Sequence, residues 1–197
     1  FKACEWHGEI IANPPREDYG HRVGRDTLFE KDASFAECEF YSKCNFQNTR
    51  FIKKANFSKC HFHKGGSFNQ ATFAEGTTFW DTVSDASLHF RKAHFQGVAN
   101  FGQTTLAARS SFNDAQFDND AVFFQSQFEG DVFLSGATFS RQLKLNKLRS
   151  QGGLIMQRIQ ANDINLTQSD IADRFILSGS HIGTLRAMGL SVGTWMG

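Results

Sequence analysis

A Cys and two His stand close together at Cys60, His61 and His63, and these residue types are common ligands of zinc. Their order argues against a shared ion. Neighbouring residues of an extended segment point to opposite sides, so Cys60 and His61 are expected to diverge. No Cys-x-x-Cys or His-x-x-x-His pair elsewhere in the sequence supports a site. We therefore expect no metal site and no cofactor.

Groups that could catalyse a reaction are equally sparse. The sequence contains no phosphate-binding loop and no glycine fingerprint for a dinucleotide. The remaining candidates are histidines expected to face solvent and a short acidic run, namely His61, His63, His89, His94, Asp114, Asp118 and Asp120. We expect no catalytic residue and no enzymatic activity.

The elements that would have to position such residues are revealed by a repeat of Phe. From Phe35 to Phe73 a Phe recurs alternately five and six residues apart, which gives a period of 11. Two such series run from 29 to 139 and from 35 to 145, and their 22 slots hold 18 Phe, three Leu and Ser84. A small residue usually stands two positions before each slot. A fixed internal period of this kind is typical of stacked repeats.

Two structures compete for this pattern. Apolar residues 11 apart also suit a right-handed helical supercoil. The small residues, together with abundant Phe and scattered Gly, Asn and Asp, are poor material for a helix. Residues two apart in an extended segment face the same side, which explains why a small slot accompanies each Phe slot. We therefore favour short extended segments separated by turns.

This pattern resembles the Phe-type repeats of the pentapeptide-repeat family, from Thr27 and Phe29 to Leu143 and Leu145. The resemblance implies an all-β fold, a right-handed quadrilateral parallel β-solenoid (β-helix) with one repeat on each side. Because five and six residues alternate, each coil is expected to hold about 22 residues, with an extra residue at two opposite corners.

The repeat also predicts the core and the organisation of the chain. Residues 1–26 lack the series and are interpreted as an N-terminal cap or linker, residues 27–145 as the Phe-type solenoid, and residues 146–197 as its aliphatic continuation. The core ladder is expected to contain Phe35, Phe40, Phe46, Phe51, Phe57, Phe62, Phe68, Phe73, Phe79, Phe101 and Phe123.

Two irregularities are expected along the solenoid. Both slots become polar at 82–85, so we expect a local bulge there with Val83 turned inward. The phase is expected to slip around Gly152 and Gly153. Beyond that point the core series should continue through aliphatic residues, namely Ile155, Leu166, Leu177 and Met188 on one series and Ile171 and Ile182 on the other.

Three of the four cysteines, Cys38, Cys44 and Cys60, occupy small inward slots. Cys38 and Cys60 are 22 residues apart and should stack within reach of a disulfide. Parallel Cα–Cβ bonds would strain that disulfide, so we expect thiols that pack as small hydrophobic groups.

The outward positions predict a candidate interaction surface. With 22 residues per coil, Trp80, Gly102 and Phe124 should stack on the outside of one face, with the glycine as a gap between two aromatic side chains. Exposed apolar patches often mark interfaces. Charge is also grouped: basic residues gather at 50–64 and 141–158 and acidic residues at 110–140, although the formal net charge is only +1. Such bands are either solvated surfaces or a means of orienting a polar partner.

Three functions are weighed from these features. The favoured one is a non-enzymatic scaffold that mediates protein–protein interaction with a partner of unknown identity. The alternative comes from the resemblance, because some family members modulate type II topoisomerase (gyrase) by imitating DNA; this requires a strongly negative rod, often as a homodimer joined through the C-terminal coils. The third is an enzyme with a site on a solenoid face. Direct nucleic-acid binding is not expected, because the basic segments are short and the aromatic residues point inward.

No apolar run of about 18 residues occurs and the mean hydropathy is −0.39, so no membrane span is expected. The cysteine pattern favours a bacterial cytoplasm. A secreted effector and a soluble region of a membrane-attached protein are the alternatives, because the chain begins with Phe and the sequence leaves open whether it is a fragment of a longer protein.

Overall fold

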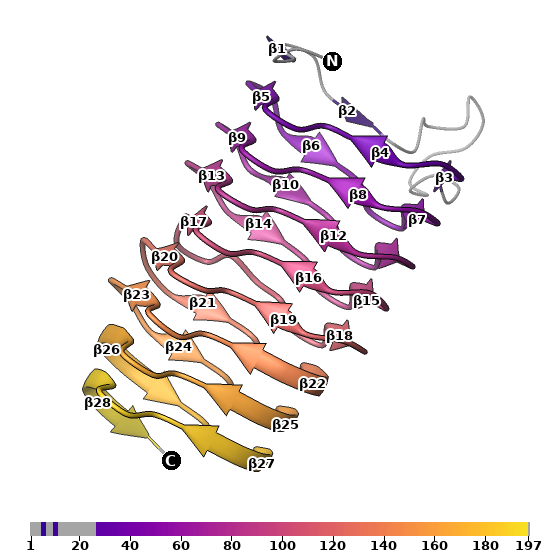
Figure 1. Ribbon diagram of the computed structural model, residues 1–197. Helices are drawn as coiled ribbons and strands as arrows, with labels where there is room; N and C mark the ends of the chain where they lie inside the picture. The colour runs from indigo at the N-terminus through magenta and orange to yellow at the C-terminus, as the bar shows by residue number, and fades with distance from the viewer. Residues whose placement is uncertain (1–4, 7–9, 12–26, 197) are drawn as a thin grey trace, which may run out of the picture.

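Short strands wind into a parallel β-solenoid of about 8 turns in this computed structural model, which describes residues 5–6, 10–11 and 27–196 (Figure 1). Successive coils lie on one another from β5 near one end to β28 at the other. These residues contain no helix. The prediction of an all-β parallel β-solenoid with about 22 residues per coil is confirmed.

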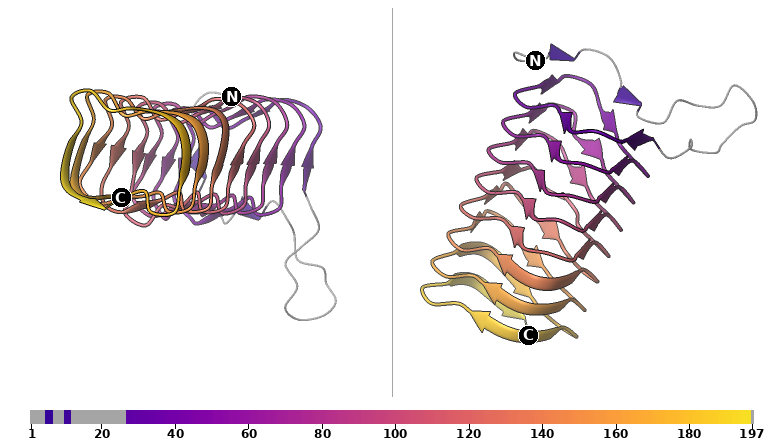
Figure 2. Two further views of the ribbon diagram at one scale, coloured as in Figure 1. Left: turned by 90° about the horizontal axis from the view of Figure 1, so that it is seen from below. Right: turned by 45° about the vertical axis from the view of Figure 1, so that its right-hand side comes forward.

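Strands of successive coils pair in parallel and form four columns, the faces of the solenoid (Figure 2). The first face consists of β3 (Leu28–Phe29), β7 (Arg50–Phe51), β11 (Thr72–Phe73), β15 (His94–Phe95), β18 (Gln116–Phe117), β22 (Thr138–Lys144), β25 (Gln160–Asn165) and β27 (His181–Arg186). The second face consists of β4 (Ala33–Ser34), β8 (Ala55–Asn56), β12 (Thr77–Thr78), β16 (Ala99–Asn100) and β19 (Ala121–Val122). It continues in β22. The beginning of β22 pairs with β18 on the first face, and the end of β22 pairs with β19 on the second face.

The third face consists of β1 (Glu5–Trp6), β5 (Glu39–Phe40), β9 (His61–Phe62), β13 (Val83–Ser84), β17 (Thr105–Leu106), β20 (Gln127–Phe128), β23 (Arg149–Ser150), β26 (Asp170–Ile176) and β28 (Ser191–Met196). The fourth consists of β2 (Ile10–Ile11), β6 (Cys44–Asn45), β10 (Gly66–Ser67), β14 (Leu88–His89), β21 (Val132–Phe133) and β24 (Leu154–Ile155). Bridges through Ser111 link β14 to β21.

The core is a set of Phe stacks along the axis. Phe79, Phe101 and Phe123 stack with centroid distances of 4.9 and 5.0 Å and nearly parallel rings. Rings from the facing stack, such as Phe90, meet them edge-on at 5.2 and 5.3 Å. The 22-residue register produces this arrangement, because it places identical side chains one strand spacing apart. Every member of the predicted ladder is buried except Phe35, which is partly buried and packs against the same core.

The corners are of two kinds that alternate around each coil. One kind is a tight turn with a residue in the left-handed conformation, such as Glu37 (φ 61°) and Asn48 (φ 57°). The other, at 41–43 and 52–54, is an open bend. Asn side chains support several tight turns, since Asn56 accepts a hydrogen bond from the Ser58 backbone N–H at 2.9 Å.

Several buried hydroxyl groups at the small slots bond to the backbone of the preceding coil, whereas that of Thr49 has no hydrogen-bond partner among the described residues. Thr82 donates to the Phe57 carbonyl at 2.6 Å, and Thr104 donates to the Phe79 carbonyl at 2.8 Å. Ser126 repeats the contact one coil later. A small slot can therefore accept a polar residue without leaving its hydroxyl group unpaired inside.

The predicted bulge at 82–85 is wrong. Val83 is paired in register with His61 and Thr105, and its side chain points outward with 36% exposure. Ser84 takes the inward slot, where its hydroxyl group donates to the Thr105 carbonyl at 3.3 Å. The polar side chains are tolerated because backbone carbonyls of the adjacent coil lie within their reach.

We expect Thr104→Val to lower the free energy of unfolding by about 0.5–1.5 kcal/mol. Valine fills nearly the same volume but cannot donate to the Phe79 carbonyl. Urea denaturation would measure the change. Thr72→Val is the matched control, because Thr72 lies on the outer side of β11 and is only partly buried. We expect this variant to change the free energy of unfolding by no more than about 0.5 kcal/mol. Equal losses in both variants would contradict the role given to the buried hydroxyl group.

The phase slip, a change in the number of residues between paired positions of successive coils, was predicted at Gly152 and Gly153. It occurs further along the chain. Thr138 pairs with Gln160, 22 residues on, whereas Leu143 pairs with Ile164, 21 residues on. Paired residues near the end of the chain are 20 apart, as in Arg174 with Thr194.

This delay changes which residues enter the core near the C-terminal end. Met156 is fully buried in the slot that continues the series through Leu145, and Ile155 beside it is 8% exposed. Leu166, Leu177 and Ile171 are buried and Ile182 is partly buried, as expected. Met188 is 78% exposed, so its assignment to the core is wrong: the shorter coils move it onto a turn.

Candidate functional site

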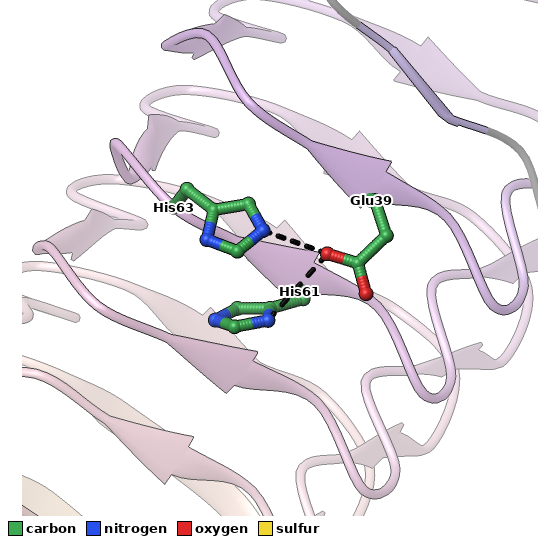
Figure 3. A group of neighbouring side chains, drawn as sticks. All are labelled: Glu39, His61 and His63. Carbon is green, nitrogen blue, oxygen red and sulfur yellow. Dashed lines mark hydrogen bonds and ion pairs between the residues drawn. The ribbon is translucent and has the colours of Figure 1, made fainter.

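The third face carries a cluster of two histidines, His61 and His63, beside the carboxylate of Glu39 (Figure 3), and Asp85 lies on their other side. Glu39 Oε2 lies 2.7 Å from His63 Nε2 and 3.5 Å from His61 Nδ1. On the other side, Asp85 Oδ1 lies 2.9 Å from His61 Nε2 and Asp85 Oδ2 lies 3.0 Å from His63 Nδ1. The centroids of the two imidazole rings are 3.8 Å apart.

The 22-residue register assembles this cluster from three coils. Glu39 on β5 pairs with His61 on β9. His63 and Asp85 follow β9 and β13 at equivalent places, and the His63 backbone N–H bonds to the Phe40 carbonyl. The ring of Tyr41 stacks on that of His63 at 4.6 Å, which helps to fix the imidazole.

Hydrogen bonding sets the ionisation of Asp85. The hydrogen bond with His61 is the largest cause that holds the pKa of Asp85 below its ordinary value; burial opposes it, and the hydrogen bond with His63 acts in the same direction as that with His61. Asp85 is therefore an ionised carboxylate at neutral pH, and it can accept a hydrogen bond from a ring N–H.

The sequence analysis weighed Cys60, His61 and His63 as metal ligands and expected Cys60 to point away from His61. Cys60 does point into the core, and its thiol donates to the Phe35 carbonyl at 2.9 Å. It takes no part in the cluster. Glu39 and Asp85 were missed, although subtracting 22 from 61 and adding 22 to 63 leads to them.

The other small-slot cysteines are also enclosed. Cys38 and Cys44 are buried, and burial, with a smaller effect of Cys38, raises the pKa of Cys44 to about 12. A thiol with so high a pKa is almost entirely protonated near neutral pH and therefore a poor nucleophile.

Trp80 and Phe124 lie on the outside of the second face, two coils apart and both partly exposed. Gly102 lies between them. A Cβ atom at Gly102 would come within 2.6 Å of Trp80 Cζ3, so the indole ring lies over the glycine. Phe124 is covered in part by Lys147, whose Nζ is 5.8 Å from the ring centroid. The glycine gap thus lets Trp80 lie flat along the face.

A shallow polar groove of about 610 Å³ runs beside this aromatic surface. The residues that directly follow Trp80 and Phe124 in the chain are part of its lining. Amide side chains dominate its lining. The lining residues are Asp81, Gln103, Thr105, Gln125, Gln127, Lys147, Arg149 and Gln168. Such a surface offers hydrogen-bond donors and acceptors along several successive coils.

The three acidic candidates of the sequence do not form a carboxylate pair. Asp118 contacts His94 at 2.7 Å, and Asp114 contacts Arg91 at 3.5 Å. Asp120 contacts Lys144 at 2.8 Å, and this hydrogen bond is the main cause that lowers the pKa of Asp120.

The remaining histidine candidate, His89 on β14, is only partly buried. Desolvation, assisted by the charge of Lys43, lowers the pKa of His89. It is therefore neutral near pH 7 and does not join the His61 and His63 cluster.

A Gly-x-Ser-x-Gly pattern at 189–193 was not among the sequence candidates, and the structure gives it no catalytic context. Ser191 begins β28, where its backbone N–H bonds to the Ser169 carbonyl of the coil before. The nucleophile of this motif normally stands at a sharp turn between a strand and a helix.

Large apolar side chains are exposed on the last two strands. Trp195 is 53% exposed and Met196 is 48% exposed, and Leu185 on β27 is similar. A homodimer through these coils stays a prediction.

In a comparison with family models, the model described as pentapeptide repeats (9 copies) matches residues 25–72 and 46–91. No curated protein matches the chain significantly. Within the described residues, no helix is long and apolar enough to span a membrane.

Proposed function

Since the chain is a pentapeptide-repeat protein with a β-solenoid arrangement, we propose that it is a non-enzymatic scaffold that binds a protein partner through the aromatic surface of Trp80, Gly102 and Phe124. One observation carries this proposal. The partly exposed indole of Trp80 lies over Gly102, beside a groove of amide and charged side chains, on strands that pack on the Phe core.

This combination suits a protein partner. Binding interfaces are enriched in Trp and Phe, and they surround such residues with polar groups that can form hydrogen bonds. The lining side chains repeat at the spacing of the coils, so an extended segment of a partner could contact several coils at once. A rigid surface also loses little conformational entropy on binding.

Imitation of DNA is supported less well. A DNA mimic requires unpaired carboxylates along the rod, but many of the described carboxylates form an ion pair with a Lys or Arg side chain. The pairs include Lys53 with Glu75, Lys144 with Asp120, Arg174 with Asp131, and Arg186 with Asp163. Together with a formal net charge of +1, this leaves little negative field outside the molecule.

We expect the double variant Trp80→Ala, Phe124→Ala to lose a bacterial protein that the unchanged chain captures from lysate. The reason is that both aromatic anchors of the surface are removed while the core Phe stacks remain. Affinity capture followed by mass spectrometry would identify the protein, and a binding assay with the purified partner would measure the loss, which we expect to exceed tenfold (about 1.4 kcal/mol).

The matched control is the double variant Val83→Ala, Val98→Ala, which removes two exposed apolar side chains outside the aromatic surface. Capture unchanged by this control is expected. Capture of gyrase subunits by all three proteins would favour DNA imitation and contradict the proposal, and so would a purified partner that binds the Trp80 and Phe124 variant with unchanged affinity.

A further inference from the structure

The cluster on the third face contains more hydrogen-bond acceptors than two neutral imidazole rings can satisfy. All four ring nitrogens of His61 and His63 face carboxylate oxygens, at 2.7 to 3.5 Å. An ionised carboxylate only accepts hydrogen bonds, and a neutral imidazole carries a single N–H. The two neutral rings can therefore donate hydrogen bonds in only two of these four contacts.

One pair of tautomers directs both N–H groups to Asp85. Its contacts are balanced, with His61 Nε2 at 2.9 Å and His63 Nδ1 at 3.0 Å on separate oxygens. The lone pairs of His61 Nδ1 and His63 Nε2 then converge on Glu39 Oε2. Three acceptor atoms facing one another repel unless a positive species lies among them.

The two imidazole rings lie side by side, with centroids 3.8 Å apart. A divalent cation supplies the positive charge while both rings stay neutral. The ligand atoms of Glu39, His61 and His63 all lie within 4.8 Å of one another, which is close enough for one ion.

We propose that Glu39, His61 and His63 bind one Zn²⁺ ion, through the Glu39 carboxylate, His61 Nδ1 and His63 Nε2. Two imidazoles and one carboxylate are an established zinc donor set, and the fourth position takes water. A tetrahedral ion about 2.0–2.1 Å from its ligands holds them roughly 3.3 Å apart, so small side-chain movements complete the site. Imidazole is not a preferred ligand of Ca²⁺ or Mg²⁺.

Asp85 orients the two ligands in this arrangement. Histidines that bind a metal usually donate their second ring N–H to a carboxylate, which fixes the tautomer. Here one carboxylate serves both rings. The ligand side chains are 27–37% exposed, so an ion can enter from solvent. The site joins β5 to β9 and would act as a clip between the two coils, independently of any protein partner.

Isothermal titration of the metal-free, full chain with ZnCl₂ tests the proposal. We expect one ion per chain, and loss of this binding in His61→Ala, His63→Ala and Glu39→Gln. Asp85→Asn should retain the ligands but weaken binding by about 10–100-fold. These side chains are on the surface, and circular dichroism would show that each variant keeps its strands.

His94→Ala is the matched control, because His94 contacts a single carboxylate, Asp118, and has no second imidazole beside it. Its affinity for Zn²⁺ should equal that of the unchanged chain. Replacement of Zn²⁺ by Co²⁺ should give a spectrum without a thiolate-to-metal charge-transfer band. Absence of Zn²⁺ binding, equal binding by the His61→Ala and His94→Ala variants, or a thiolate band would each overturn the proposal.

Discussion

Replacing Phe101 by Ala is expected to lower the free energy of unfolding by about 3–5 kcal/mol. Phe101 is fully buried in the middle of its stack. It has a parallel ring on each side, Phe79 at 4.9 Å and Phe123 at 5.0 Å, and an edge-on contact with Phe112 at 5.1 Å. The cavity cannot close easily, because strands above and below it are fixed by hydrogen bonds to their neighbours.

Denaturation in guanidinium chloride would measure this loss. Phe35→Ala is the control: Phe35 is partly exposed and, among the described residues, its one parallel neighbour is Phe57 at 4.8 Å, so a smaller loss is expected. In a stacked-repeat protein each coil is stabilised by its neighbours, so the central variant is also expected to unfold less cooperatively, with a lower dependence on denaturant concentration. A loss no larger than that of Phe35→Ala would refute the stacked-core account.

The Phe series predicted the fold because a single side chain per face determines the register. Once Phe51 and Phe73 must stack, the number of residues between them sets the length of a coil, and the strands follow. The small slot two residues earlier has the same origin, since it faces the same interior at a corner where only a small side chain fits.

The errors arose where hydrophobicity alone was used to assign the interior. Ser84 was expected to leave its slot, but a hydroxyl group close to carbonyls of the next coil is satisfied there. Met188 was expected inside, but coil length falls from 22 to 21 and then to 20 residues once the Phe stacks end. Where no stack of Phe rings fixes the register, the length of the turns determines it. A turn that is one residue shorter changes the sequence pattern very little.

The sequence predicted which residues lie close together on the outer faces, but not how their side chains contact one another. The register alone places Glu39 beside His61 and Asp85 beside His63, so the cluster could have been found by comparing residues 22 apart. The way in which the indole of Trp80 lies across the neighbouring glycine depends on side-chain rotation, which spacing does not reveal.

Gly97→Ala is expected to destabilise the protein by about 1–3 kcal/mol, although the added methyl group is small. The reason is the distance between coils. A Cβ atom at Gly97 would stand 2.5 Å from the Gly76 backbone nitrogen and would also meet the carbonyl carbon of Glu75, whereas Cβ atoms essentially never come within 3.0 Å of such atoms. The backbone of one coil would have to move away from the next, which would also strain the adjacent strand hydrogen bonds.

The neighbouring coil offers a matched control at the same corner. A Cβ atom at Gly76 would meet only the Val98 carbonyl oxygen, at 3.7 Å, which is an ordinary contact. Gly76→Ala should therefore be neutral or stabilise the protein by roughly 0.4–1 kcal/mol, because alanine restricts the unfolded chain. Thermal and urea denaturation of the two variants would separate these expectations. If Gly76→Ala were as harmful as Gly97→Ala, the cause would be the conformation of the corner rather than the approach of one coil to the next.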